Sequence, residues 1–425
     1  MSSRIFAWSA ACIIAVTMVQ PARASVQLQP IWRSISAHNS NHTCALTWNG
    51  GKVWCWGRNN FGQLGNSSVP TSGTLAFTNS TVPVQVLGLA GPAVAIAVGN
   101  DTSCAILNTG SVQCWGSNEN YMLGTSSVSP GNGYTSSPVY VNNLGAPAIA
   151  LSIGYEHACA VLNNGTVSCW GFNHQYSLGT SWNSGDYALP AAVPGVSGAI
   201  AIAAGMDSTC AIEKKSQWGG LKIVTFYEPV CWGDNGASEG GQPPSYGFLP
   251  TAYNAAPWDL TGITAGNLFG CALSASSNVI CWGRDFDEGE LGDNHSCHDT
   301  GSGSTNGCYM PQTVWNIPSG AKRVASGGDS SCALAGDSTI YCWGDNTYGQ
   351  SGSGYSWYTP QNIGNFPSPT QAMTYTNTST DVGVGGDYAC ALTDNGNRIQ
   401  CWGRNNQGQL GNGTYNDSPS PTYTW

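Results

Sequence analysis

One motif recurs along this chain and limits what the chain can fold into. A short apolar segment links two cysteines, and the second cysteine opens the tripeptide Cys-Trp-Gly. The pattern occurs seven times, with tryptophans at Trp56, Trp115, Trp170, Trp232, Trp282, Trp343 and Trp402. Successive tryptophans lie 50 to 62 residues apart, a period that favours propeller blades over a helical solenoid.

The copy from Cys104 to Cys114 predicts a hairpin. If the two cysteines face each other across an antiparallel pair, Ile106 faces Val112 and three residues remain for the turn. The last of these, Gly110, can take the left-handed conformation that such a turn needs. Cysteines opposed in this way lie within disulfide reach.

We therefore predict one cross-strand disulfide per repeat. The pairs are Cys44–Cys55, Cys104–Cys114, Cys159–Cys169, Cys210–Cys231, Cys271–Cys281, Cys332–Cys342 and Cys390–Cys401. An eighth pair, Cys297–Cys308, would staple an extra loop in the fifth repeat. Zinc ligation is the alternative, but cysteines about ten residues apart, with no second pair in the repeats other than the fifth, do not make four-ligand sites.

Each repeat also shows sequence signals of an inner strand, a glycine-rich turn and an outer strand. A run of small and β-branched residues ending in glycine precedes the first cysteine, as in residues 93–99, and suits a crowded hub. A glycine-rich turn follows Trp-Gly, as in residues 59–65, and then a proline-led strand such as residues 83–86. The expected fold is all-β: a seven-bladed β-propeller of four-stranded blades with one cross-strand disulfide per blade.

The two ends of the chain carry separate expectations. Residues 1–24 read as a secretory signal peptide, with Arg4, an apolar run and the sequence Ala22-Arg23-Ala24. Residues 25–425 would form a single propeller closed by the C-terminal strand. The segment 419–425 is expected to supply the outer strand of the first blade, which begins at Ile31.

Cysteine content and charge limit the compartment and the partners. Without Cys12, which lies in the apolar run, sixteen of the 17 cysteines remain, and this even number suits a secreted protein in the extracellular space or the periplasm. Only 8% of residues are charged and the net charge is −10, which argues against nucleic acid as a partner. No second hydrophobic segment follows, so no membrane span is expected.

The repeats resemble those of the regulator of chromosome condensation repeat family. The third repeat carries the resemblance in Ile153-Gly154, His157, Ala160-Val161, Gly165-Thr166-Val167 and Trp170-Gly171, and the seventh continues it through Gly411. The resemblance implies a propeller but no single activity, because the family includes a nuclear exchange factor for a small GTPase, a plant ultraviolet-B photoreceptor and a secreted β-lactamase inhibitor. The photoreceptor's Gly-Trp-Arg-His-Thr repeats are absent.

Five acidic residues are candidate binding residues. Each lies three residues before the first cysteine of its repeat: Asp101, Glu156, Asp207, Asp329 and Asp387. In a propeller these turns would ring one mouth of the channel, where five carboxylates repel one another unless a cation or a basic partner meets them. The alternative is turn chemistry, since aspartate accepts bonds from nearby backbone amides.

Aromatic residues are expected on long loops of the same face. Those singled out as candidate anchors are Trp182, Tyr187, Tyr246, Phe248, Trp357 and Tyr358. Exposed aromatic side chains are common anchors for proteins and for sugars. The sequence thus predicts a secreted, non-enzymatic binding propeller with a protein partner, and a glycan-binding propeller is the alternative. Exchange of nucleotide on a small GTPase, implied only by the resemblance, is disfavoured.

Three further features of the sequence do not lead to a predicted site. Residues 285–290 resemble a short calcium loop but occupy the place of the ordinary glycine-rich turn, so no metal or cofactor is predicted. No serine-hydrolase, zinc-protease or phosphate-loop motif appears, so no enzyme is predicted. The hairpin between Cys210 and Cys231 is enlarged and holds three of the five lysines, which suits either a projecting binding finger or a solvated hairpin.

Overall fold

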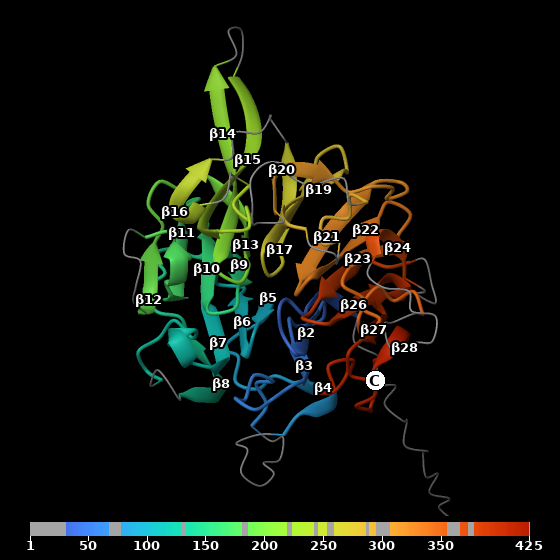
Figure 1. The fold of residues 1–425 in the computed structure, drawn as a ribbon. Coiled ribbons are helices and arrows are strands. Elements are labelled where there is room, and N and C mark those ends of the chain that lie inside the picture. The colour runs from blue at the N-terminus through green and yellow to red at the C-terminus, as the bar shows by residue number, and fades with distance from the viewer. Residues whose placement is uncertain are drawn as a thin grey trace, which may run out of the picture.

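The computed structural model describes residues 31–67, 78–128, 133–180, 186–218, 223–241, 245–252, 259–285, 289–294, 307–354, 366–372 and 378–424. For residues 186–188, 245–252, 307–310 and 366–367 only the backbone is described. The described strands form seven four-stranded antiparallel sheets arranged as blades around a central axis (Figure 1). The predicted seven-bladed propeller is therefore confirmed.

Each blade is built from four strands that are consecutive in the chain. From the inner to the outer strand, blades one to three are β1 (Trp32–Ser36), β2 (His42–Thr47), β3 (Val53–Gly57) and β4 (Ser80–Gln85); β5 (Ala93–Gly99), β6 (Thr102–Leu107), β7 (Val112–Ser117) and β8 (Tyr134–Tyr140); and β9 (Ala148–Ile153), β10 (His157–Leu162), β11 (Val167–Phe172) and β12 (Asp186–Ala192).

Blades four and five follow the same order. They are β13 (Ala199–Ala204), β14 (Ser208–Trp218), β15 (Ile223–Asn235) and β16 (Ser245–Ala252); and β17 (Leu260–Ala265), β18 (Phe269–Ser274), β19 (Val279–Arg284) and β20 (Gly307–Thr313). Blades six and seven are β21 (Ala321–Gly327), β22 (Ser330–Ala335), β23 (Ile340–Gly344) and β24 (Phe366–Gln371); and β25 (Asp381–Val384), β26 (Tyr388–Thr393), β27 (Arg398–Gly403) and β28 (Ser418–Tyr423).

The disulfide of each blade joins its second strand to its third. Cys104 pairs with Cys114 in the register of β6 and β7, and Ile106 pairs with Val112, as the hairpin argument predicts. Seven such bonds are present, with the two Cα atoms 4.0–4.1 Å apart, and all seven predicted blade pairings are confirmed. Cys297 lies outside the described residues, so the eighth pair stays a prediction.

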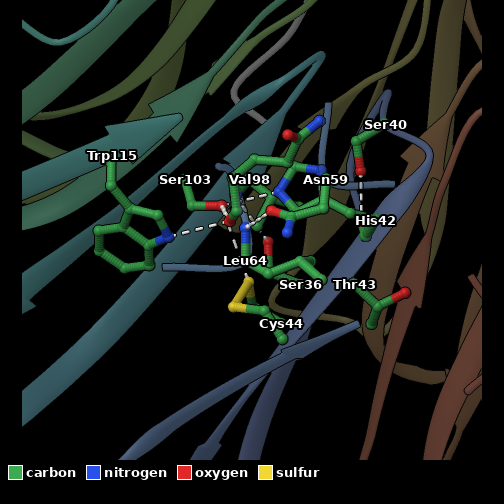
Figure 2. The surroundings of a disulfide bond; sticks show 12 residues. Ser36, Ser40, His42, Thr43, Cys44, Asn59, Leu64, Val98, Ser103 and Trp115 are labelled. Carbon is green, nitrogen blue, oxygen red and sulfur yellow. Dashed lines mark hydrogen bonds between the residues drawn. A yellow bond between two sulfur atoms is a disulfide. The ribbon is translucent and has the colours of Figure 1, made fainter. Parts of the chain in front are cut away.

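The tryptophan of Cys-Trp-Gly joins each blade to the preceding one. The Trp115 indole donates to the main-chain oxygen of Gln63, 2.9 Å away, and Figure 2 shows Trp115 and Ser103 of the second blade facing Leu64 and Cys44 of the first. The same bond, 2.8–3.0 Å long, recurs at every blade junction. Gly65, in the same turn as Gln63, lets the indole come this close, because a Cβ on Gly65 would lie 2.8 Å from the Trp115 indole nitrogen.

The ring closes without exchange of a strand, and here the sequence-based expectation is wrong. The C-terminal strand β28 pairs with β27 of its own blade, while β4 completes the first blade. The seventh blade joins the first through the ordinary junction: the Trp56 indole donates to the Gln409 carbonyl, 2.9 Å away. The Tyr388 hydroxyl adds a 2.7 Å bond to the His42 carbonyl. Because β4 pairs with β3 of its own blade, the C-terminal strand is not needed there.

Small and branched aliphatic side chains line the hub. All seven inner strands border a central cavity of about 180 Å³, with walls that include Ile96, Leu151, Ile202, Ile263 and Val382. The helical elements in the described ranges are single-turn segments, η1 (Glu119–Tyr121), η2 (His174–Tyr176) and η3 (Asp394–Gly396). None of these is long or apolar enough to cross a bilayer.

Candidate functional site

The five predicted acids all lie in turns between the first and second strands of their blades. In each of these blades the residue after Trp-Gly donates its amide to the acid's own carbonyl; for example, Asp234 donates to Asp207 over 2.9 Å. The glycine permits this contact: Gly233 has a φ of 101°, and a Cβ there would lie 2.3 Å from the Asp207 carbonyl oxygen. The residue after Trp-Gly therefore lies beside the acid of its own blade. We call the face that carries these turns the loop face.

Three of the five acids are paired with arginine. Asp101 lies 3.2 Å from the Arg58 guanidinium of the preceding blade, and the Gln63 amide donates to it over 2.7 Å. Asp329 lies 3.0 Å from the Arg284 guanidinium. Asp387 accepts a 2.7 Å bond from Arg404 of its own blade. For these three residues the expected repulsive ring of carboxylates is wrong, because arginines that the sequence argument did not assign to the turns neutralise them.

The other two predicted acids, Glu156 and Asp207, have no arginine beside them in the described structure. The preceding blade, which supplies Arg58 to Asp101, has Ser117 after Trp-Gly in the case of Glu156 and Phe172 in the case of Asp207. Asp207 lies 3.3 Å from His174, whose ring stacks on Phe172. Burial raises the pKa of Glu156, and the carboxylates of Asp207 and Glu119 add to that rise.

Blade four extends this negative region. Its residue after Trp-Gly is itself acidic, Asp234, and five positions later Glu239 takes the place held by glutamine in blades one, six and seven. In blade six the Gln350 amide donates to Asp345 over 2.8 Å, whereas one buried oxygen of Glu239 has no partner among the described residues. Burial raises the pKa of Glu239 to about 7, and the charges of Asp234 and Asp207 act in the same direction.

The loop face thus has two electrostatic halves. From blade five through blade seven, Glu290, Asp329 and Asp387 meet arginines, and Asp345 accepts bonds from Thr347 and Gln350. Across blades two to four lie acids that meet only His174 among the described basic side chains: Glu119, Glu156, Asp207 and Asp234. We call these four residues the acidic arc. The sequence pointed to Glu156 and Asp207; Glu119 and Asp234 were missed, although the change from arginine to acid after Trp-Gly could have revealed Asp234.

The channel mouth on this face is spanned by a side chain that the sequence argument did not single out. His38 lies between β1 and β2, and its two ring nitrogens are 2.9 Å from the Ser326 carbonyl oxygen and 2.7 Å from the Ala204 carbonyl oxygen. These contacts link the first blade to the sixth and the fourth across the axis. On the loop face the channel entrance is therefore spanned by the His38 side chain and is not an open pore.

The aromatic candidates are placed only in part. Trp182, Trp357 and Tyr358 lie outside the described residues. Tyr187 and Phe248 belong to outer strands, where their backbones pair with Gly171 and Gly233, and Tyr246 lies in the same outer strand as Phe248. Their role in binding stays a prediction.

The calcium-like segment forms an ion pair with the residue that precedes it. The Arg284 guanidinium donates to Glu290 over 2.9 Å, and Asp285 is buried. Residues 286–288 fall outside the described ranges. Across the described residues, no group of three or more histidine, cysteine or acidic side chains is arranged to hold a metal ion.

Comparison with known proteins identifies the repeat. Two profiles of the regulator of chromosome condensation (RCC1) repeat match, one over residues 50–106 and the other over residues 32–63, 93–121, 148–176, 321–350 and 380–409. The human E3 ubiquitin-protein ligase HERC2 is 26% identical over 318 residues, which cover 72% of this chain and 6% of HERC2. The Arabidopsis thaliana ultraviolet-B receptor UVR8 is 24% identical over 325 residues, covering 75% of this chain and 66% of the receptor. The chain therefore spans less than two thirds of either relative.

Solved structures agree on the fold. Prp20p of Saccharomyces cerevisiae, whose structure was reported with its binding to Gsp1p and histones, superposes with a TM-score of 0.71 at 19% identity, covering 89% of this chain and 87% of Prp20p. Human WBSCR16 gives a TM-score of 0.71 at 20% identity, covering 88% of this chain and 94% of that one. At this level of identity the likeness concerns the fold alone.

Proposed function

Because the chain is a propeller built of regulator of chromosome condensation repeats, we propose that it is a secreted, non-enzymatic binding protein whose loop face engages a basic surface of a partner protein. The acidic arc is the observation that carries this proposal. Its four carboxylates have no arginine or lysine partner in the described structure, whereas Asp101, Asp329 and Asp387 each have an arginine. A lysine or arginine of a partner would supply the missing charge.

The chemistry of the arc favours association through charge. Burial disfavours the ionised forms of Glu156 and Asp207, and neighbouring carboxylates disfavour them further. A cationic side chain placed beside them lowers that free energy, and the field of the arc speeds the approach of a basic surface. Trp182 and Trp357 are proposed as the apolar anchors that then slow dissociation.

Secretion is supported by chemistry as well as by the leader-like residues 1–24. Seven disulfides, one in each blade, indicate folding in an oxidising compartment. Prp20p, which has the same fold, is reported to bind Gsp1p and histones. That precedent supports a protein partner here without naming one.

The test begins with capture of a partner by the mature chain from the medium in which the protein is found. Association is then measured against salt for a variant with Glu156→Gln, Asp207→Asn and Asp234→Asn. We expect association to slow about tenfold at low salt and to lose most of its salt dependence. Trp182→Ala with Trp357→Ala should mainly speed dissociation.

A matched control removes the same number of charges from the opposite face. Asp259, Asp337 and Asp394 lie at the start of an inner strand or between second and third strands, so their change to asparagine leaves the loop face intact. Equal effects of the two triple variants would show that only net charge matters. Binding that survives the arc and tryptophan changes but is lost when residues 214–227 are trimmed would place the partner on the other face.

A further inference from the structure

One position in the turn after Trp-Gly recurs in every blade, because its main-chain oxygen accepts the indole bond of the next blade. In blade four this residue is Glu239, which accepts from Trp282 over 2.9 Å. In blade five it is Glu290, which accepts from Trp343 over 3.0 Å. Glutamine holds the position in blades one, six and seven. The partners of the Glu239 side chain can therefore be compared with those of its equivalents.

One end of the Glu239 side chain is held as in another blade. Its Oε2 accepts from the amide of Ala237 over 2.8 Å, and in blade six the side-chain oxygen of Gln350 likewise accepts from the amide two residues before it. The other end of Gln350 donates to Asp345, the residue after Trp-Gly, over 2.8 Å. The shared anchor therefore aims Oε1 of Glu239 toward the residue after Trp-Gly in its own blade, which is Asp234.

This second end of Glu239 has no partner in the described structure. The residue is 2% exposed, and its Oε1 makes no hydrogen bond with a described residue. Asp234 is half-buried and accepts through Oδ1 from the amides of Asn235 and Gly236, which are 2.8 and 3.0 Å away. Burial raises the pKa of Glu239 to about 7, and the charges of Asp234 and Asp207 add to that rise. Two carboxylates thus face one space, and each disfavours the charge of the other.

In blade five an arginine fills the equivalent space. The Arg284 guanidinium donates from Nε to Glu290 Oε1 over 2.9 Å and lies 3.0 Å from Asp329. In blade four the shorter Asp234 stands where Arg284 stands, so the cation is missing and its place is not filled by a long side chain. Little crowds this place, because the three atoms nearest to a Cβ built on Gly236 all belong to the Asp234 carboxyl group, 3.5–4.0 Å away.

We propose that this space receives the guanidinium of an arginine from the partner protein, held between Glu239 Oε1 and the Asp234 carboxylate. The inference rests on the proposed binding of a basic surface to the loop face and names the side chain that is bound there. We call Asp234 and Glu239 the acceptor pair.

Arginine matches the acceptor pair better than other cations do. Its planar guanidinium carries several N–H donors in a fixed fork and can bond to two carboxylates at once, as Arg284 does in blade five. The ammonium group of lysine is a single compact charge without this fork. A calcium ion takes about six or more oxygen ligands, which two side chains do not supply. The partner's arginine thus replaces in blade four the arginine that the chain itself supplies in blade five.

The test uses the full mature protein and three blocked amino acids as probes: acetyl-arginine amide, acetyl-lysine amide and acetyl-citrulline amide. Citrulline has nearly the shape of arginine without its charge. Saturation-transfer NMR of the probe signals should show binding of the arginine probe, weaker binding of the lysine probe and none of the citrulline probe. Glu239→Gln should weaken binding of the arginine probe by about tenfold. This variant should fold, because glutamine stands at the same position in blade six.

Two further variants serve as controls. Glu119→Gln removes one charge from the acidic arc without changing the acceptor pair, so it should weaken binding of the arginine probe less than Glu239→Gln does. Asp337→Asn, between the second and third strands of blade six, should leave binding unchanged. The proposal is overturned if the arginine and citrulline probes bind equally, or if Glu239→Gln binds the arginine probe as well as the unmodified protein does.

Failure of this inference can be told apart from failure of the proposed function. If a captured partner loses affinity when Glu156, Asp207 and Asp234 are changed together but keeps it with Glu239→Gln, the proposed function stands and the arginine site is wrong. If the arginine probe binds at the acceptor pair while no basic partner of the loop face is captured, the arginine site stands and the proposed function is wrong.

Discussion

Blades four and five place a glutamate at the same position of the loop face but surround it differently. In blade five the Arg284 guanidinium bonds to Glu290 over 2.9 Å and to Asp329 over 3.0 Å. In blade four Asp234 stands where Arg284 stands, and Glu239 keeps a buried oxygen without a partner among the described residues. The comparison teaches that the repeat fixes where a buried carboxylate lies, while one residue after Trp-Gly decides whether that carboxylate meets an arginine or another acid.

The largest expected effect removes the arginine of blade five. Arg284→Met leaves Glu290 and Asp329 without their partner, and breaking a buried ion pair from one side costs about 3 kcal/mol of unfolding free energy at pH 8. Burial raises the pKa of Glu290 to about 7 although Arg284 acts to lower it, so the cost should shrink at pH 5, where Glu290 is protonated. Urea unfolding at both pH values measures this.

Arg58→Met is the matched control for that change. Asp101 would keep the Gln63 amide at 2.7 Å, so the loss should be clearly smaller. Equal losses for the two arginines would show that pairing in blade five contributes nothing special, and the contrast between the blades would fail.

A smaller effect of the opposite sign is expected in blade four. The folded-state pKa of Glu239, about 7, lies above its ordinary value of 4.5, so its ionisation destabilises the fold above pH 7 and this cost disappears as the pH falls toward 4.5. Glu239→Gln, which restores the glutamine of blade six, should therefore stabilise the protein by about 2 kcal/mol at pH 8 and hardly at all at pH 5. A gain independent of pH would contradict this cause.

The smallest effect comes from transferring the arginine. Asp234→Arg should bring a guanidinium to Glu239 but loses the bonds that Asp234 accepts from the amides of Asn235 and Gly236. The net stabilisation at pH 8 should be about 1 kcal/mol, measured by urea unfolding. The same variant should weaken binding of a basic partner; if it destabilises the protein even at pH 8, the two blades are not equivalent at this position.

Much of the fold follows from local patterns in the sequence. The two cysteines, the turn glycine and Trp-Gly each act within one blade or between neighbouring blades, so Cys104, Gly110 and Trp115 could be placed without a structure. The way the ring closes could not be predicted in this way. The C-terminal strand β28 could have paired with β27 of its own blade or with β3 of the first blade, and the folded packing selects β27. The charge balance was equally hidden, since Arg58 and Asp101 are 43 residues apart in the chain yet 3.2 Å apart in the fold.

Closure without strand exchange has a consequence for how such a ring could be rearranged. Each sheet and each described disulfide is confined to one continuous stretch of chain, and the junction between the seventh and first blades uses the same indole bond as the others. A circular permutant opened at any blade boundary would keep every sheet whole and every cysteine beside its mate. The ring therefore needs no particular starting blade: the order of the blades around the axis, and not the position of the chain ends, defines the fold.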